Sequence, residues 1–371
     1  MSKYKSFAVT ETGISHIKQG KNCQDSFFCI EIGDTSIAIA ADGHGDDNCF
    51  RSEKGAKLAV NCAVKGIAEF VKIHESRFTK GFKKKDIPTH DEFNKAIRDL
   101  VKHIIAMWQV KVEEDYKANP ITSDELAITD EKYRKKYEAG NNLNKAYGTT
   151  LIAAAITSNY WLGIHIGDGR LTALYPDGSF DQPIPWDEKC YLNVTTSICD
   201  DDALEQARLY FSFNKEKTPP AAVIICTDGI DDNYPVEGNE KHLFKLYRTI
   251  ALTFAKEGFD STCEQLKELA NAFATKGKGD DTSIAGFIDL ETLKKTEQIW
   301  QKQIDEEEKI IVKKNEKEEK KLAADIESEK ESSKEQITLK ALQTIIGKEG
   351  IAKYGEFTTG KINGSRIDKK I

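Results

Sequence analysis

The chain has 371 residues, of which 39% are hydrophobic, so it is long enough for one large domain or two ordinary ones. Its formal net charge of −7 argues against a general nucleic-acid-binding protein, which would present a basic surface. No apolar run reaches the length of a membrane span, and we expect no secretory leader at the N-terminus. The eight cysteines are scattered without a Cys-x-x-Cys pair, which predicts a reduced, cytoplasmic protein.

The first part of the chain predicts strands followed by two helices. Residues 7–41 alternate short apolar strands with glycine and polar turns. Apolar residues recur at helical spacing over 51–73 and again over 91–117, where Asp91 is the expected N-cap. The polar segment 118–144 is expected to be a connector that contains a short helix.

Strands return in the second part of the chain. Each predicted strand is a short apolar run bounded by turn residues, and together they cover 149–156, 160–166, 171–175, 221–227 and 282–290. Residues 180–218 contain prolines and an acidic run and are expected to be irregular. Two more helices are predicted over 241–256 and 262–275.

The composition changes after Leu290. About half of residues 291–340 are charged, with both signs interspersed, so residues 291–345 are expected to form a solvated helical extension. Residues 346–371 are glycine-rich with a basic end and are expected to be a flexible tail. The helix could serve a partner or self-association, and we divide the chain into a domain over 1–290 followed by these two segments.

Acidic residues stand at the abrupt ends of the predicted strands. The four main stretches pair aspartate with glycine: Asp42-Gly43-His44-Gly45, Gly167-Asp168-Gly169-Arg170, Asp228-Gly229-Ile230-Asp231-Asp232 and Gly279-Asp280-Asp281-Thr282. A strand delivers its terminal side chain to a fixed place, and glycine lets the chain turn at once. Carboxylates gathered in this way repel one another unless a hard divalent cation holds them, so the sequence predicts a metal cluster beside His44.

The order of these motifs resembles that of the metal-dependent protein phosphatases of the type 2C family, over roughly residues 6–290. The resemblance rests on Gln24-Asp25, Asp42-Gly43-His44-Gly45, Gly148-Thr149-Thr150, Gly167-Asp168-Gly169-Arg170, Asp228-Gly229-Ile230 and Gly279-Asp280-Asp281-Thr282-Ser283. It implies hydrolysis of phosphoserine and phosphothreonine in proteins. It also implies an α+β fold: a four-layer αββα sandwich of two mainly antiparallel sheets flanked by helices.

The resemblance also implies roles for individual residues. Two divalent cations, Mn²⁺ or Mg²⁺, would be held with a bridging water, and a third ion would bind more weakly. The matching ligand positions are Asp42, which would bridge the ions, the carbonyl of Gly43, Asp228, Asp280, Asp25 through water, and Asp168 with Asp232 for the third ion. His44 matches the histidine that protonates the departing serine or threonine oxygen, a role suited to imidazole.

Two positions depart from the family pattern. Gln24 replaces a glutamate found in many relatives, and Gly20 stands where many have an arginine that holds the substrate phosphate. His16, Lys18 and Lys21 are the candidates to replace this arginine. A bacterial branch of the family begins similarly, with a Ser-His-Ile-Lys-x-Gly-x-x-Cys-Gln-Asp segment, so the departure is consistent with a subtype.

The alternatives that remain are a pseudophosphatase that binds a phosphoprotein or partner without hydrolysis, and a phosphatase for a small metabolite. The missing carboxylate and arginine motivate the first alternative, whereas retention of Asp42, His44, Asp228 and Asp280 argues against it. The sequence does not identify the substrate, the opposing kinase or the metal used in the cell.

Overall fold

The computed structural model describes residues 2–79, 88–190, 194–235 and 238–332, and it contains two five-stranded antiparallel sheets. The first sheet has the order β1 (Lys5–Glu11), β10 (Thr282–Ile288), β9 (Ala222–Cys226), β6 (Arg170–Leu174) and β7 (Phe180–Asp181). The second has the order β2 (Ser26–Ile32), β3 (Thr35–Ala41), β4 (Leu151–Ile156), β5 (Tyr160–Ile166) and β8 (Arg208–Phe213).

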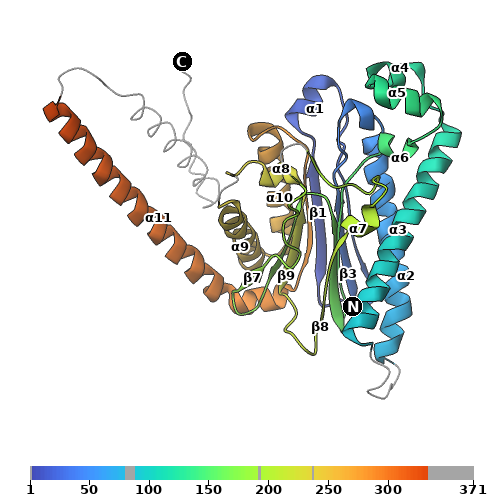
Figure 1. The fold of residues 1–371 in the computed structure, drawn as a ribbon. Coiled ribbons are helices and arrows are strands. Elements are labelled where there is room, and N and C mark those ends of the chain that lie inside the picture. Colours follow the sequence, from blue (N-terminus) through green and yellow to red (C-terminus); the bar gives the residue numbers. More distant parts are fainter. Residues whose placement is uncertain (1, 80–87, 191–193, 236–237, 333–371) are drawn as a thin grey trace.

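The sheets stack face to face between two pairs of helices (Figure 1). Helices α2 (Ser52–Thr79) and α3 (His90–Ala118) cover the outer face of the second sheet. Helices α9 (Asn239–Glu257) and α10 (Phe259–Lys276) cover the first. The predicted four-layer αββα sandwich is therefore confirmed.

The central strands are buried on both faces, which explains their continuous apolar sequences. Every residue of β3, β4 and β5 is buried, because one face meets helices and the other meets the opposite sheet. These buried strands are rigid supports for the residues that directly follow them. The shorter elements lie at the ends of the sandwich: α1 (Ile14–Gln19), η1 (Asp47–Cys49), α4 (Ser123–Ile128), α5 (Glu131–Glu138), α6 (Leu143–Ala146), α7 (Ala203–Gln206) and α8 (Asp228–Asp231).

Three details differ from the sequence prediction. The N-cap of α3 is Thr89 and not Asp91, because the Thr89 hydroxyl and the Glu92 carboxylate form a reciprocal capping box. The segment predicted to be irregular contains an ordered strand, β8, which completes the edge of the second sheet. The predicted connector holds three short helices, α4, α5 and α6.

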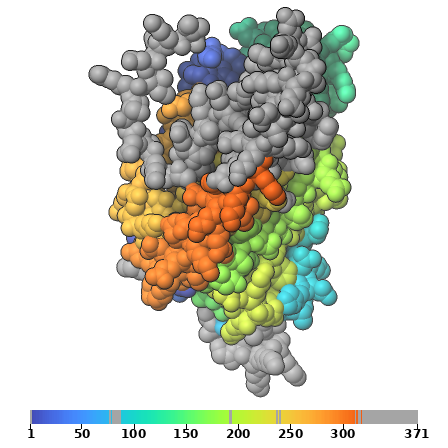
Figure 2. Space-filling view, turned by 90° about the vertical axis from the view of Figure 1, so that its left-hand side faces the viewer, coloured from blue at the N-terminus to red at the C-terminus, as the bar shows by residue number. Residues whose placement is uncertain are grey.

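The last described helix, α11 (Leu290–Ser332), begins on the sandwich and then leaves it (Figure 1). Figure 2 shows its first part, in orange, lying across the face of the molecule. Leu293, Trp300 and Ile304 are buried against the core formed with α9. Arg248 of α9, itself buried, pairs with Glu307. The apolar core thus continues beyond Leu290 into the first part of α11.

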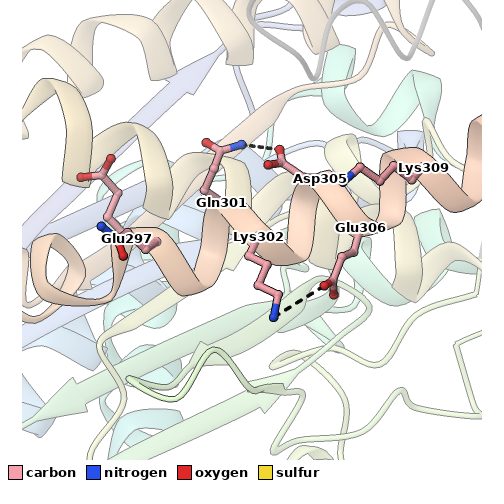
Figure 3. A pocket seen from close by; sticks show the side chains of 7 residues that line it. Glu297, Gln301, Lys302, Asp305, Glu306 and Lys309 are labelled. Carbon is pink, nitrogen blue, oxygen red and sulfur yellow. Dashed lines mark hydrogen bonds and ion pairs between the residues drawn. The ribbon is translucent and has the colours of Figure 1, made fainter.

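The outer face of α11 is polar and lines a shallow hollow (Figure 3). Gln301 donates a 2.7 Å hydrogen bond to Asp305, and Lys302 pairs with Glu306 at 3.8 Å. The side chains of Ile311, Leu322 and Ile326, farther along α11, lie outside the described side chains, as does the whole predicted tail 346–371. Each helix among the described residues is too short or too polar to cross a lipid bilayer.

Candidate metal centre

Three strand ends bring aspartates together at one end of the sandwich. Asp42 follows β3, Asp168 follows β5, and Asp228 follows Thr227 at the end of β9. One carboxylate oxygen from each of the three lies within 4.8 Å of the others. Because β3 and β5 belong to one sheet and β9 to the other, the cluster spans the two sheets.

The backbone of Asp42 is held by the segment that starts β4. Its N–H donates to the Thr150 hydroxyl at 2.9 Å, and its carbonyl accepts from the Thr150 N–H at 2.8 Å and the Thr149 hydroxyl at 2.7 Å. The Gly148-Thr149-Thr150 motif therefore fixes the chain direction where Asp42 leaves the strand.

Asp42 and Asp228 each place a carboxylate oxygen within 4.8 Å of the other. Burial raises the pKa of both groups well above the ordinary value, and repulsion from neighbouring aspartates contributes to the rise. A site whose buried carboxyl groups bind protons this readily is chemically prepared to exchange a proton for a cation.

Asp25 ties the N-terminal segment to the ends of two strands. Its Oδ2 accepts hydrogen bonds from the hydroxyls of Thr227, at 2.8 Å, and Ser283, at 2.7 Å. Its Oδ1 is buried without a hydrogen-bond partner in the described part of the chain. Burial, followed by repulsion from Asp281, raises the pKa of Asp25 to about 7. An unpaired buried carboxylate oxygen beside other carboxylates fits a water or cation as its partner.

Two other predicted ligands lie at the rim. Asp280 and Asp232 are exposed, and Asp232 faces Lys278 at 3.6 Å. The neighbouring Asp281 is buried instead and accepts hydrogen bonds from the N–H groups of Gly13, at 2.7 Å, and Gln24, at 2.6 Å. The sequence analysis assigned Asp281 no role, although adjacent aspartates ahead of a strand must point in different directions.

Gly43 has no room for a side chain. A Cβ at this position would lie 2.8 Å from the carbonyl oxygen of Gln24 and 2.9 Å from that of Ser52. Glycine therefore lets three backbone segments meet beside Asp42, and it leaves the Gly43 carbonyl as a candidate oxygen ligand.

His44 is held on both sides. Its backbone N–H donates to the carbonyl of Gly148 at 3.2 Å, and its Nε2 lies 2.7 Å from the hydroxyl of Ser197. A Cβ on Gly148 would lie 2.6 Å from the His44 ring, so this glycine makes space for the imidazole. Burial, together with the positive charge of the nearby Lys145, lowers the pKa of His44 to about 4.

The three cations proposed to bind phosphate differ in position. The Lys21 ammonium donates to the Gly45 carbonyl at 3.3 Å, and His16 Nδ1 lies 3.0 Å from Asp281. Lys18 is exposed on α1. Lys145, half-buried on α6 near His44, is a fourth cation, and no sequence motif identified it.

The donor set fits a hard divalent cation. Every candidate ligand atom is a carboxylate or carbonyl oxygen, which Mn²⁺ and Mg²⁺ prefer over sulfur or imidazole sites. The raised pKa values of Asp25, Asp42 and Asp228 express the free-energy cost of burying these carboxylates and of crowding their negative charges, which bound cations would offset.

Comparison with protein families agrees with this chemistry. The family model described as protein phosphatase 2C matches residues 12–274. The serine/threonine phosphatase Stp1 from Staphylococcus aureus is 15% identical, with 78% of this chain and 95% of that chain covered and a TM-score of 0.43. The catalytic domain of the serine/threonine protein phosphatase PstP, solved with two manganese ions, is also 15% identical, with coverages of 77% and 97% and a TM-score of 0.42.

A third structure, the serine/threonine phosphatase of S. agalactiae, is 14% identical, with coverages of 77% and 99% and a TM-score of 0.43. No curated protein matches the sequence. The family model spans well over half of the chain, and its metal-dependent chemistry agrees with the gathered carboxylates. The chain therefore belongs to the protein phosphatase 2C family of Mn²⁺- or Mg²⁺-dependent serine/threonine phosphatases.

Proposed function

We propose that this chain hydrolyses phosphoserine and phosphothreonine in cytoplasmic proteins, with His44 protonating the departing oxygen. The observation that carries the proposal is the meeting of Asp42, Asp168 and Asp228 at strand ends from both sheets. His44 follows Asp42 by two residues along the chain. Phosphate monoesters hydrolyse extremely slowly without help, so both charge neutralisation and proton transfer are needed.

Bound cations would neutralise the phosphoryl oxygens and acidify water, which is the chemistry that carboxylates alone lack. Asp42 would lie between two ions, and the remaining ligands would be Gly43 through its carbonyl, Asp228, Asp280 and Asp25 through water. Asp168 and Asp232 would hold a third, weaker ion. The exposed position of Asp280 and Asp232 lets both carboxylates adjust when cations bind.

The proposed role of His44 is to hold a proton next to the leaving oxygen. Its pKa of about 4 means that the free enzyme carries a mostly neutral imidazole at pH 7. A phosphate dianion in the site opposes the effect of burial and raises this pKa, so the protonated imidazole forms with substrate bound. A general acid of this kind contributes typically about 10²–10⁴-fold in rate.

For the substrate phosphate, we propose Lys21 and His16 as the cations, with Lys18 less suited because it is exposed. Lys21 already contacts Gly45, which follows His44 directly. A lysine supplies a point charge where an arginine would supply two parallel donors, so phosphate would be held with less directional specificity.

The test is hydrolysis of a phosphothreonine peptide with and without Mn²⁺. The matched variants are Asp42→Ala in the site and Asp99→Ala on the exposed face of α3. We expect Mn²⁺-dependent turnover that is lost in Asp42→Ala and kept in Asp99→Ala. No turnover with any metal, in a folded protein that binds the phosphopeptide, would instead support the pseudophosphatase. Turnover of small phosphate esters alone would favour a metabolite phosphatase.

The role of the C-terminal segment remains a separate proposal. We propose a catalytic domain over 1–290, an extension over 291–345 that recruits a partner or a second copy, and a tail over 346–371. Light scattering of the full chain and of a chain ending at 310, which keeps Trp300 and Ile304, tests self-association. A monomer mass for both would reject it.

A further inference from the structure

We propose that Ser197 is a positioning residue that fixes the tautomer of His44, so that Nδ1 is the nitrogen that delivers the proton. The inference rests on the proposed role of His44 as the general acid, and it adds Ser197 as the residue that positions this acid. Ser197 lies in the segment between β7 and β8, which the sequence analysis left irregular and without a function.

Ser197 is itself held firmly. It is 1% exposed, and its backbone N–H donates to the Asp200 carboxylate at 2.9 Å. Its hydroxyl oxygen lies 2.7 Å from His44 Nε2, 3.0 Å from the Thr149 carbonyl oxygen and 3.3 Å from the Cys199 backbone nitrogen. Two of these neighbours have a fixed role in a hydrogen bond, as acceptor or as donor, whereas His44 Nε2 can be either, depending on the tautomer.

The number of hydrogen bonds that a serine hydroxyl can donate and accept favours one tautomer of His44. A hydroxyl has one hydrogen to donate and two lone pairs that accept. The Thr149 carbonyl can only accept and the Cys199 N–H can only donate, so Ser197 donates to the first and accepts from the second. One lone pair of the Ser197 oxygen then remains for His44 Nε2. Because a lone pair can only accept a hydrogen bond, Nε2 must carry the hydrogen that is donated to it.

The reverse arrangement makes fewer hydrogen bonds. If Ser197 donated to Nε2, its hydroxyl would no longer donate to the Thr149 carbonyl. The Cys199 sulfur, 3.1 Å from the hydroxyl, is a weaker acceptor than a carbonyl and does not reverse this preference. A lost buried hydrogen bond costs about 0.5–1.5 kcal/mol, enough to favour the Nε2–H tautomer about two- to tenfold.

This tautomer suits proton delivery without internal rearrangement. Nδ1 of His44 has no hydrogen bond within the described part of the chain, so it is the nitrogen open to exchange. In the protonated ring both nitrogens carry hydrogen. The Nδ1 proton passes to the departing serine or threonine oxygen as the bond from phosphorus to that oxygen breaks. The ring is left neutral with its hydrogen on Nε2, still donating to Ser197.

The same residue that orients Ser197 also holds the carboxylate segment. The Thr149 hydroxyl donates to the Asp42 carbonyl at 2.7 Å, while the Thr149 carbonyl accepts from Ser197 at 3.0 Å. His44 and the backbone of Asp42 are thus both connected to Thr149, just before β4, through three hydrogen bonds: His44 to Ser197, Ser197 to Thr149, and Thr149 to Asp42.

The first test reads the tautomer directly and needs no catalysis. Nitrogen-15 NMR of the histidine-labelled protein at pH 7, with His44→Gln for assignment, distinguishes the Nε2–H from the Nδ1–H ring. We expect Nε2–H in the wild type and a shift toward Nδ1–H in Ser197→Ala. The matched control is Ser36→Ala, which removes a buried hydroxyl at the opposite end of β3. A wild-type Nδ1–H ring, or no change in Ser197→Ala, would overturn the proposal.

The second test reads the proton-transfer step through the leaving group. An aryl phosphate leaves without protonation, whereas a phosphoserine peptide needs the acid. In Ser197→Ala we expect kcat to fall about 10–100-fold for the peptide and less than about threefold for p-nitrophenyl phosphate, with Ser197→Thr restoring most of the loss. An equal fall for both substrates would mean a structural role only. Absence of peptide turnover in the wild type would refute the proposed function, while the NMR result would still decide the tautomer.

Discussion

Replacing Asp228 with asparagine should stabilise the metal-free protein and abolish its stabilisation by metal. The two effects have opposite signs, which separates a metal ligand from a structural aspartate. Asp228 lies with Asp42 and Asp168 in a group whose carboxylate oxygens are within 4.8 Å of one another. Asparagine keeps the shape of the side chain and removes its charge.

The magnitude follows from Coulomb's law. Two unit charges separated by about 5 Å at an effective dielectric constant of about 20 repel by roughly 3 kcal/mol. The three residues are mostly buried but keep some contact with solvent, and screening by this solvent reduces the repulsion to about 1 kcal/mol for each pair. Because the raised pKa values of Asp42 and Asp228 leave part of this charge neutralised by protons, removing the Asp228 carboxylate should raise the metal-free stability by at most about 1 kcal/mol, or the Tm by about 2–4 °C.

The assay is thermal unfolding with and without Mn²⁺ at pH 7.5. In the wild type, free Mn²⁺ at about one hundred times its Kd should add about 2.7 kcal/mol for each site occupied only in the folded state. Asp228→Asn should show a higher Tm without metal and little further rise with it. The control Asp99→Asn, exposed on α3, should match the wild type. A lower metal-free Tm with an intact response to Mn²⁺ would refute the reasoning.

Three further predictions follow from burial and packing. Burial raises the pKa of Asp25 in the folded state to about 7, above its value in the unfolded chain, so the metal-free protein should lose stability as the pH rises toward 7.5. The gain in Tm on adding Mn²⁺ should therefore be larger at pH 7.5 than at pH 5.5. An equal gain at the two pH values would contradict this prediction. Gly148→Ala places a Cβ 2.6 Å from the His44 ring and should lower phosphopeptide turnover more than about tenfold. Unchanged turnover would show that catalysis does not require the His44 ring in its position beside Gly148. Trp300→Ala, at a side chain 2% exposed, should cost about 3–5 kcal/mol in denaturant unfolding, whereas Ile299→Ala, 42% exposed, should cost under about 1 kcal/mol; equal costs would mean that α11 does not dock.

The sequence predicted the strands and the acids at their ends because both signals are local. A continuous apolar run that stops at aspartate-glycine identifies a buried strand and its terminal side chain without knowledge of the sheet order. Ile37 to Ala41 and Ala222 to Cys226 behave in this way, and the structure brings the aspartates that follow them together.

The residues that the sequence did not identify depend on contacts between distant segments. Ser197 meets His44 across 153 positions, and Asp281 meets Gly13 across 268, so neither has a local pattern. The N-cap of α3 was placed two residues late because Asp91 and Thr89 are both good caps, and the reciprocal bond with Glu92 decides between them. The docking of Trp300 was not predicted because a thin apolar stripe in a charged helix does not reveal what covers it.

The central proposal is that the strand-end carboxylates would hold two cations, with Asp42 as a ligand to both. Titration of the metal-free protein with Mn²⁺, followed by electron paramagnetic resonance, measures both the number of ions and their magnetic coupling. We predict two bound ions per chain with an exchange-coupled spectrum, and loss of that coupling in Asp42→Ala. A single isolated Mn²⁺ signal in the wild type, or a coupled spectrum that survives in Asp42→Ala, would contradict the account.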